Sequence, residues 1–321
     1  MMTRITTILT VSFICLGLTN PASAAAKEKK GGDAGKDKAA SSTGVNNYNA
    51  GNKAFEAKQY PQAIAEYSRA IDLNPKQPEF WENRGFAYLA MERYDEANTD
   101  FTKVIELAPN DDRAYLGRAQ VYLKQQVFDL ALADAEKAIQ LKPDNIAAIQ
   151  IRGFANNGQQ QWDKAIADFD KAIQANPNDW QNYDARALAY RKLKTYDKAI
   201  ADYDAAIQQN PNNAQEYARR GYTYAEMRDY EKAIPDFQQA LKLNPNDPDT
   251  PMRLQYAQSM LAQKSQPTPT PIPDATPAPA ATTLFTPLNI ALGVVVLGIL
   301  AAVIRLITRG KAEPTSSTRI R

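Results

Sequence analysis

The chain has 321 residues, enough for one or two domains, and a formal net charge of +2. It contains no histidine and a single cysteine, Cys15, which excludes internal disulfides, zinc sites of the Cys/His type and catalysis by a histidine base. Between residues 44 and 247 acidic residues outnumber basic ones, which argues against a surface for nucleic acid.

The N-terminus predicts a secretory signal peptide over residues 1–24. Arg4 is followed by an apolar run and by small residues that form a cleavage site ending at Ala24. An uncleaved membrane anchor is the alternative interpretation. The next segment, 25–43, is rich in Lys, Gly and Ser without apolar periodicity, and we expect it to be a disordered leader.

Between residues 44 and 247 the sequence repeats with a period of 34 residues. Proline closes each unit at Pro75, Pro109, Pro143, Pro177, Pro211 and Pro245. An alanine recurs twelve residues earlier at Ala63, Ala97, Ala131, Ala165, Ala199 and Ala233. An aromatic precedes each alanine at Tyr60, Tyr94, Phe128, Trp162, Tyr196 and Tyr230. A small residue recurs at Gly51, Gly85, Ala119, Gly153, Ala187 and Gly221.

This pattern resembles the tetratricopeptide repeat, in which each unit is a pair of antiparallel helices. The resemblance implies an all-α fold, a right-handed superhelical solenoid of helix-turn-helix repeats. Because no unit can bury its own apolar face, stability is expected to come from neighbouring units. The six predicted repeats are 44–77, 78–111, 112–145, 146–179, 180–213 and 214–247. In the third and fourth, Ala135 and Asn156 replace aromatic residues, which predicts a thinner core and a hinge.

Charged residues also recur at the repeat period. Carboxylates of the second helices stand at Glu66, Asp100, Asp134, Asp168, Asp202 and Asp236. Arginines of the first helices stand at Arg84, Arg118, Arg152, Arg186 and Arg220. We expect these side chains to form a ladder of ion pairs between helices, whereas Asp197 and Asp204 are expected to face water or to begin their helix. Catalytic carboxylates need distinct environments, and equivalent copies do not provide them.

After the repeats, residues 248–264 predict a cap helix that covers the last unit with Met252, Leu254, Tyr256 and Met260. Residues 265–287 are rich in proline and predict an extended linker, with a ligand for a proline-reading domain as the alternative.

A charge-free apolar run at residues 284–304 predicts a transmembrane helix over residues 288–307, long enough to cross a bilayer core of ~30 Å. A buried core helix is the alternative, and the proline-rich segment argues against it. The basic tail 308–321 is expected to stay in the cytoplasm. Together with the signal peptide, this predicts a single-pass membrane protein whose repeats lie outside the cytoplasm, in a periplasm, a lumen or the exterior.

The resemblance further implies that the first helices line a concave groove that binds an extended peptide or a helix. The candidate residues on that face are Asn52, Asn83, Phe86, Arg113, Gln120, Phe154, Leu188, Arg191 and Tyr222. Four of them, at Phe86, Phe154, Leu188 and Tyr222, occupy equivalent positions and predict an apolar stripe. The alternative is that these four merely pack along their helices.

Some members of the family clamp a C-terminal carboxylate with asparagines and cations from three units. Asn52, Asn83 and Arg113 match three of those positions, but Tyr48 and Gly117 stand where the other two cations should be. We therefore do not expect a carboxylate clamp in this chain.

These observations predict a non-enzymatic scaffold for protein–protein interaction, tethered to a membrane, whose partner is a protein or peptide of the envelope or a lumen. No cofactor, metal, nucleic acid or small-molecule substrate is expected. Two alternatives are a passive structural spacer and a carboxylate-based glycan hydrolase. The hydrolase would need a unique pair of acids, and each acidic cluster in the sequence recurs with the repeat.

Overall fold

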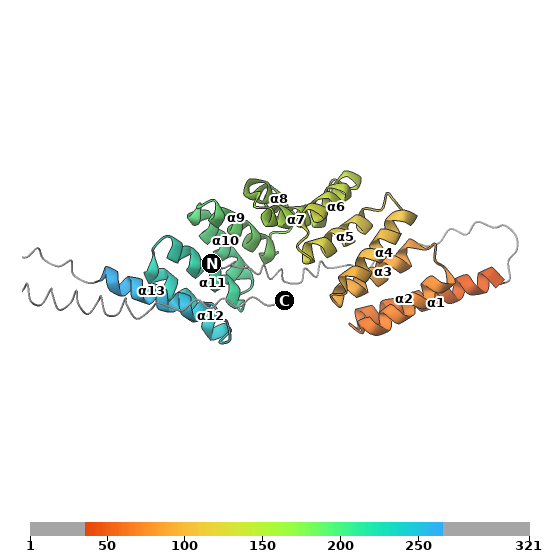
Figure 1. The fold of residues 1–321 in the computed structure, drawn as a ribbon, viewed down its shortest axis with the longest axis horizontal. Coiled ribbons are helices and arrows are strands. Elements are labelled where there is room, and N and C mark those ends of the chain that lie inside the picture. The colour runs from red at the N-terminus through yellow and green to blue at the C-terminus, as the bar shows by residue number, and fades with distance from the viewer. Residues whose placement is uncertain (1–35, 266–321) are drawn as a thin grey trace, which may run out of the picture. The chain divides into compact units, whose positions relative to one another are not determined.

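The computed structural model describes residues 36–265, and over this part of the chain it contains thirteen helices and no strand. Figure 1 shows the helices following one another in chain order as successive pairs joined by short turns. The helices are α1 (Lys36–Glu56), α2 (Tyr60–Leu73), α3 (Pro78–Ala90), α4 (Tyr94–Leu107), α5 (Asp112–Lys124), α6 (Phe128–Leu141), α7 (Ile146–Gly158), α8 (Trp162–Ala175), α9 (Trp180–Lys192), α10 (Tyr196–Gln209), α11 (Ala214–Glu226), α12 (Tyr230–Leu243) and α13 (Thr250–Lys264). The predicted all-α fold is confirmed.

The first helix starts earlier than expected. Because α1 begins at Lys36, residues 36–43, which were predicted to be disordered, are helical. The sequence offers a reason, since Lys36, Lys38, Ala39 and Ala40 are all good helix formers. The predicted signal peptide lies outside the described residues.

Helix contacts define an inner side of the stack. Each helix packs against the next one along the chain, and first helices also contact one another, α3 with α5, α5 with α7 and α7 with α9. Between Lys36 and Ser265 the second helices make no comparable contacts with each other. A stack held together in this way curves with its first helices inside. We call this side the inner face and mark it by the equivalent residues Asn52, Phe86, Gln120, Phe154, Leu188 and Tyr222.

The helix ends are fixed by local sequence. The first helices α5, α7, α9 and α11 begin after Asp111, Asn145, Asp179 and Asn213, whose side chains accept a hydrogen bond from a backbone N–H of the first turn. At the end of α9, Lys194 N–H donates to Arg191 O at 2.9 Å, and Thr195 N–H donates to Tyr190 O at 2.9 Å. This is a Schellman motif, with Lys194 in the left-handed region at φ 60°.

The core is built from the residues that define the repeat. All six recurring alanines, from Ala63 to Ala233, are fully buried. The second-helix rings at Tyr67, Phe101, Phe169, Tyr203 and Phe237 are also buried. Small residues let helices approach these rings: a Cβ added to Gly51 would lie 2.6 Å from the Tyr67 ring.

A second rule joins neighbouring repeats. The second-helix core residue of one repeat meets the residue sixteen positions later, on the first helix of the next repeat. A Cβ on Gly117 would lie 2.3 Å from Phe101 Cε1, and Ala185 packs with Phe169 in one buried cluster. We call these residues cross-repeat pairs: Tyr67/Asn83, Phe101/Gly117, Ala135/Ile151, Phe169/Ala185 and Tyr203/Arg219, with Phe237/Arg253 equivalent to them by sequence position.

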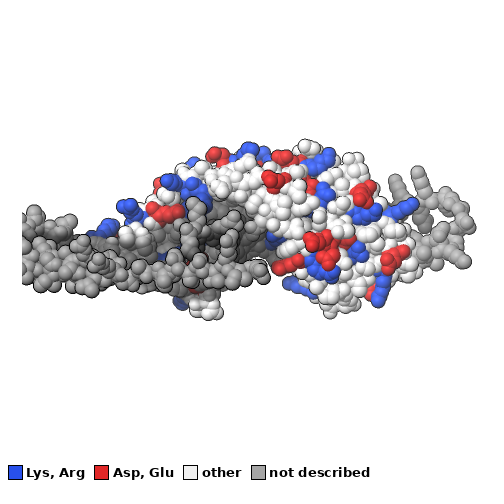
Figure 2. All heavy atoms as spheres, in the orientation of Figure 1, with Lys and Arg blue, Asp and Glu red and all other residues white. Residues whose placement is uncertain are grey.

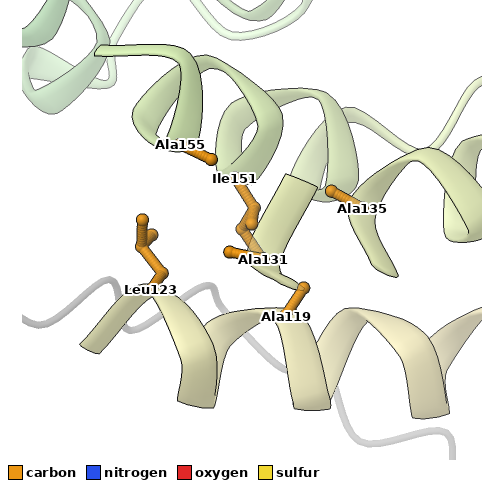
Figure 3. Close-up of a cluster of buried hydrophobic side chains, with 6 residues drawn as sticks. All are labelled: Ala119, Leu123, Ala131, Ala135, Ile151 and Ala155. Carbon is orange, nitrogen blue, oxygen red and sulfur yellow. The ribbon is translucent and has the colours of Figure 1, made fainter. Parts of the chain in front are cut away.

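At the junction of the third and fourth repeats, this rule explains the missing ring. Ala135 is the small member of its pair and Ile151 the large one, and both are fully buried with Ala119 and Ala131 (Figure 3). Ile151 points from α7 toward these alanines and supplies the bulk that a ring supplies elsewhere. The predicted hinge stays a prediction, but the core at this junction is filled.

The ion-pair ladder is confirmed in five repeats. Asp100, Asp134, Asp168, Asp202 and Asp236 lie 2.6–2.8 Å from their arginines. The first repeat differs because Ala50 stands in the arginine position, and Glu66 pairs instead with Arg69 of its own helix at 2.5 Å.

Two of these arginines also pair with a carboxylate of the preceding repeat. Arg220 contacts Asp204 and Arg186 contacts Asp170, each at 2.5 Å. Asp204 faces water as expected, with its side chain 53% exposed, and Arg220 reaches back to it from the next repeat.

The cap helix α13 packs on the last repeat with Leu254, Ala257, Met260 and Leu261. Met252 is 67% exposed and Tyr256 55% exposed, so the predicted covering role is wrong for Met252 and holds for Tyr256 only through an edge contact with Tyr230. Within residues 36–265 no helix combines the length and the apolar content that a bilayer crossing requires. The predicted linker, transmembrane helix and basic tail, from residue 266 onward, lie outside the described residues.

Candidate functional site

All nine candidate residues lie on first helices. Arg113 is exposed and the other eight are half-buried. The structure brings Asn52 together with Asn83, and Arg191 together with Tyr222. The remaining five lie at separate points of the inner face.

Near the start of the stack, a set of polar side chains is fully engaged. Tyr67 Oη donates to Asn52 Oδ1 at 2.8 Å, and Asn83 Nδ2 donates to the same oxygen at 2.8 Å and to Tyr48 Oη at 3.0 Å. Burial raises the pKa of Tyr67, so its hydroxyl stays protonated and acts as a donor. The cross-repeat pair Tyr67/Asn83 is therefore polar, and both of its members donate a hydrogen bond to Asn52.

Two of the predicted stripe residues are core residues in part. The Phe86 ring packs edge-on against Phe101 with centroids 5.0 Å apart, and Phe154 packs in the same way on Phe169 at 5.1 Å. Each phenylalanine thus covers a buried ring beneath it. Wherever the second-helix ring is phenylalanine in these middle repeats, the inner-face residue above it is apolar.

The Arg113 guanidinium already has two acidic partners. Its Nη2 lies 2.8 Å from Asp111 Oδ2, and its Nη1 lies 3.4 Å from Glu82 Oε2. Burial raises the pKa of Glu82 to about 7, although Arg113 opposes the rise. The positive charge of Arg113 is therefore balanced within the chain.

A buried charged cluster lies at the other end of the described stack. Arg219 of α11 pairs with Asp184 of α9 and lies 4.0 Å from Glu216 Oε1. Glu216 is fully buried and accepts a hydrogen bond from Asn213 Nδ2 at 3.1 Å. Burial, and after it the nearby Asp184, raise its pKa to about 9. Glu216 is therefore protonated at neutral pH.

Sequence reasoning missed this cluster. Its members stand at positions that are mostly apolar or neutral in the other repeats, Glu82 at the position equivalent to Asp184 being the exception, and only the acid–arginine spacing between Asp184 and Arg219 could have signalled it. Tyr203 lies beneath it, fully buried, and is the polar version of the second-helix ring. Its hydroxyl finds no hydrogen-bond partner within the described residues.

Tyr222 lies between two arginines. The Arg191 Cζ is 4.7 Å from the centre of its ring, and the Arg253 Cζ, from α13, is 4.4 Å from it. Arg191 also reaches Glu226 at 3.4 Å. A guanidinium stacked on a ring uses its flat face, and its N–H donors stay free at the edge.

The wider surface is mixed in charge. On the face shown in Figure 2, acidic and basic side chains are interspersed over the described helices rather than gathered by sign. Between Lys36 and Ser265 no group of three or more Cys, Asp or Glu side chains has the arrangement of a metal site. The features of the inner face are therefore local: a polar set at α1–α3, apolar residues in the middle and arginines near α13.

Family models match much of this region. Residues 51–92 and 187–228 match a model described as TPR repeat, and residues 87–146 and 214–247 match two models described as tetratricopeptide repeat. The segment 147–186 falls between these matches. No curated protein matches the chain at a significant level.

Several solved structures have a similar fold. A chain of the APC/C hetero-tetramer Cut9-Hcn1 is 18% identical with a TM-score of 0.61, and the match covers 69% of this chain and 46% of that one. A tetratricopeptide repeat protein from Parabacteroides merdae is 21% identical with a TM-score of 0.52, over 67% and 84% of the two chains. YrrB, described as a TPR protein with an unusual peptide-binding site, is 22% identical with a TM-score of 0.50, over 60% and 97%.

The chain thus spans less than half the length of the Cut9-Hcn1 chain that it matches. At these identities the likeness shows the fold alone. The family models show tetratricopeptide repeats within residues 51–146 and 187–247.

Proposed function

The chain contains tetratricopeptide repeats, and from this premise we propose that it is a non-enzymatic scaffold that binds a protein partner on its inner face. The bound part of the partner is an extended peptide or a helix. The neighbour YrrB supports this proposal, since it shares the fold and is described as having a peptide-binding site.

The observation that carries the proposal is that the core residues recur from repeat to repeat, whereas the inner-face residues differ. The buried alanines and the ion-pair ladder recur in repeat after repeat. The inner-face residue, in contrast, changes from Asn52 to Phe86, Gln120, Phe154, Leu188 and Tyr222. A surface that only maintained the stack would repeat like the core does. Individual chemistry on one face suits recognition of a particular partner.

The proposal includes the arrangement in the cell. Six repeats, wound as a right-handed superhelix, follow a signal peptide at 1–24 and are tethered by a membrane helix at 288–307. The repeats would then face a periplasm, a lumen or the exterior, and the basic tail would face the cytoplasm. Reporter fusions after residues 265 and 321 test this topology, and a cytoplasmic signal from the first fusion would overturn it.

Site-specific crosslinking in intact cells tests the binding function. A photo-crosslinking residue replaces Gln120, which is half-buried on the inner face, or Gln140, an exposed glutamine of the second helix α6. We expect a discrete crosslinked protein, identified by mass spectrometry, from position 120 and none from position 140. Equal products at both positions would contradict an inner-face site.

Direct substitution is best made away from the core. Because Phe86 and Phe154 cover buried rings, their replacement would lower stability as well as binding. Leu188→Ser and Gln120→Ala are the cleaner variants. We expect them to reduce the crosslink yield while the thermal midpoint of the chain changes little.

A further inference from the structure

The repeat symmetry identifies an arginine whose carboxylate partner is missing from its repeat-equivalent position. Arg253 on α13 is the equivalent of Arg219 on α11, one repeat period of 34 residues later. Arg219 pairs with Asp184 of the preceding first helix. The equivalent of Asp184 for Arg253 is Ala218, which carries no charge.

The second-helix ring does not offer Arg253 a hydrogen-bond acceptor either. In the cross-repeat pairs, polar residues face tyrosines: Asn83 belongs with Tyr67, and Arg219 with Tyr203. The corresponding residue for Arg253 is Phe237, which has no hydroxyl. Within residues 36–265, the Arg253 guanidinium forms no ion pair and no hydrogen bond, and its one contact of this kind is the face of Tyr222.

The surroundings favour an added negative charge. Arg191 also stacks on the Tyr222 ring, 4.7 Å from its centre, so two guanidinium groups contact one aromatic ring. Arg191 has a single carboxylate contact, with Glu226 at 3.4 Å, and its buried Nε lacks a partner among the described side chains. Arg253 is half-buried rather than enclosed, so a partner can reach it.

We propose that Arg253, with Arg191 and Tyr222, binds an aspartate or glutamate side chain of the partner protein. The carboxylate would take the place beside Arg253 that Asp184 takes beside Arg219, and would accept hydrogen bonds from the edge of the guanidinium. The inference rests on the proposed function, and it adds the chemistry of the bound segment and its place, between α9, α11 and α13.

Peptide selection with the purified full-length chain tests the proposal. A library of random twelve-residue peptides is selected for binding, and each glutamate or aspartate of the best binder is changed to its amide. We expect one such change to weaken binding by ~10-fold, the loss of one charge-assisted contact.

Three variants locate the effect. Arg253→Gln should weaken the acidic peptide by a similar factor and make the chain indifferent to the glutamate-to-glutamine change. Ala218→Asp supplies the missing carboxylate from within the chain, and should have the same effect by occupying Arg253. Lys242→Gln removes the same charge from an exposed site on α12 and should leave binding unchanged.

The outcomes separate the two proposals. In one outcome, peptides bind to the inner face at position 120 with an affinity that neither the amide changes nor Arg253→Gln alters. This result would overturn the acidic contact and leave the scaffold function standing. If no peptide binds, the scaffold function fails and the acidic contact with it. Binding of phosphatidylserine vesicles that depends on Arg253, without a preference for acidic peptides, would overturn a protein partner at this site.

Discussion

Arg118 of α5 and Asp134 of α6 form a two-point ion pair, with Nε 2.7 Å from Oδ2 and Nη2 2.9 Å from Oδ1. The third contact of this guanidinium, from Nη1 to Thr102 Oγ1 at 3.2 Å, reaches the preceding repeat. One arginine therefore joins three helices, and hydrogen bonding to Asp134 raises its pKa, which keeps it charged.

Removal of one partner of this pair should cost more than removal of both. Asp134→Ala leaves the largely buried Arg118 without a carboxylate, and we expect it to lower the free energy of unfolding by ~2–4 kcal/mol. The double variant Arg118→Met/Asp134→Ala leaves no unpaired charge and should lose clearly less. Urea denaturation measures both. Additive losses from the two single variants would show that the pair is not coupled.

Stability should fall with rising pH because of Glu216. Its pKa rises from an ordinary 4.5 to about 9 in the folded chain. Between these values the unfolded chain has released a proton that the folded chain keeps, so the free energy of unfolding decreases as the pH increases. Glu216→Gln cannot ionise, and we expect it to be more stable than the parent at pH 8, by ~1–3 kcal/mol, with a smaller difference at pH 5. An identical pH slope in both chains would contradict the assignment.

In the pair Ala135/Ile151, the small and the large side chain should be partly interchangeable, because together they fill one volume of the core. Ile151→Ala opens a cavity in the filled core of Figure 3, and we expect a loss of ~2–4 kcal/mol. Ala135→Phe alone overfills the same space and should cost ~1–3 kcal/mol. The combination should recover part of both losses in thermal unfolding. Leu130→Ala on α6, where the leucine is 47% exposed, is the control and should change little.

The turn between the two helices of a repeat should become more stable with glycine. Lys194 is exposed at φ 60°, a backbone conformation that is sterically unfavourable for every residue with a Cβ atom. We expect Lys194→Gly to raise the free energy of unfolding by ~0.5 kcal/mol. Leu193→Gly, one residue earlier at φ −80°, should lower it instead. Opposite signs at neighbouring positions in urea titrations are the diagnostic result.

The fold follows from short-range regularities that one sequence displays. The period of the prolines and buried alanines determines the helix pairs, and the shared period of arginine and aspartate reveals the ladder. Both signals are visible because each repeat supplies a copy of the same contact. The position of α1 was harder to predict, since Ala and Lys before residue 44 favour a helix without any repeat feature to mark it.

The inner face could be assigned to the right helices but not to the right contacts. Phe86 looked exposed because its equivalents Asn52 and Gln120 are polar, yet it covers Phe101. Glu216 and Tyr203 gave no signal, and Asp184 only its spacing from Arg219, because their contacts join three helices at unequal sequence distances. The same is true of Arg253. Its missing carboxylate partner becomes visible only when the equivalent arginine, Arg219, is seen paired with Asp184.

The cross-repeat pairs have a consequence for how such a chain can change in evolution. Loss of residues 112–145 by recombination would keep the 34-residue period intact, but it would set Phe101 against Ile151, two large side chains where one fits. Loss of 146–179 would set Ala135 against Ala185 and leave a void. The side chains of neighbouring repeats are thus matched in size across each junction. A repeat can be duplicated or deleted without a packing defect only if the paired residue of the neighbouring repeat changes with it.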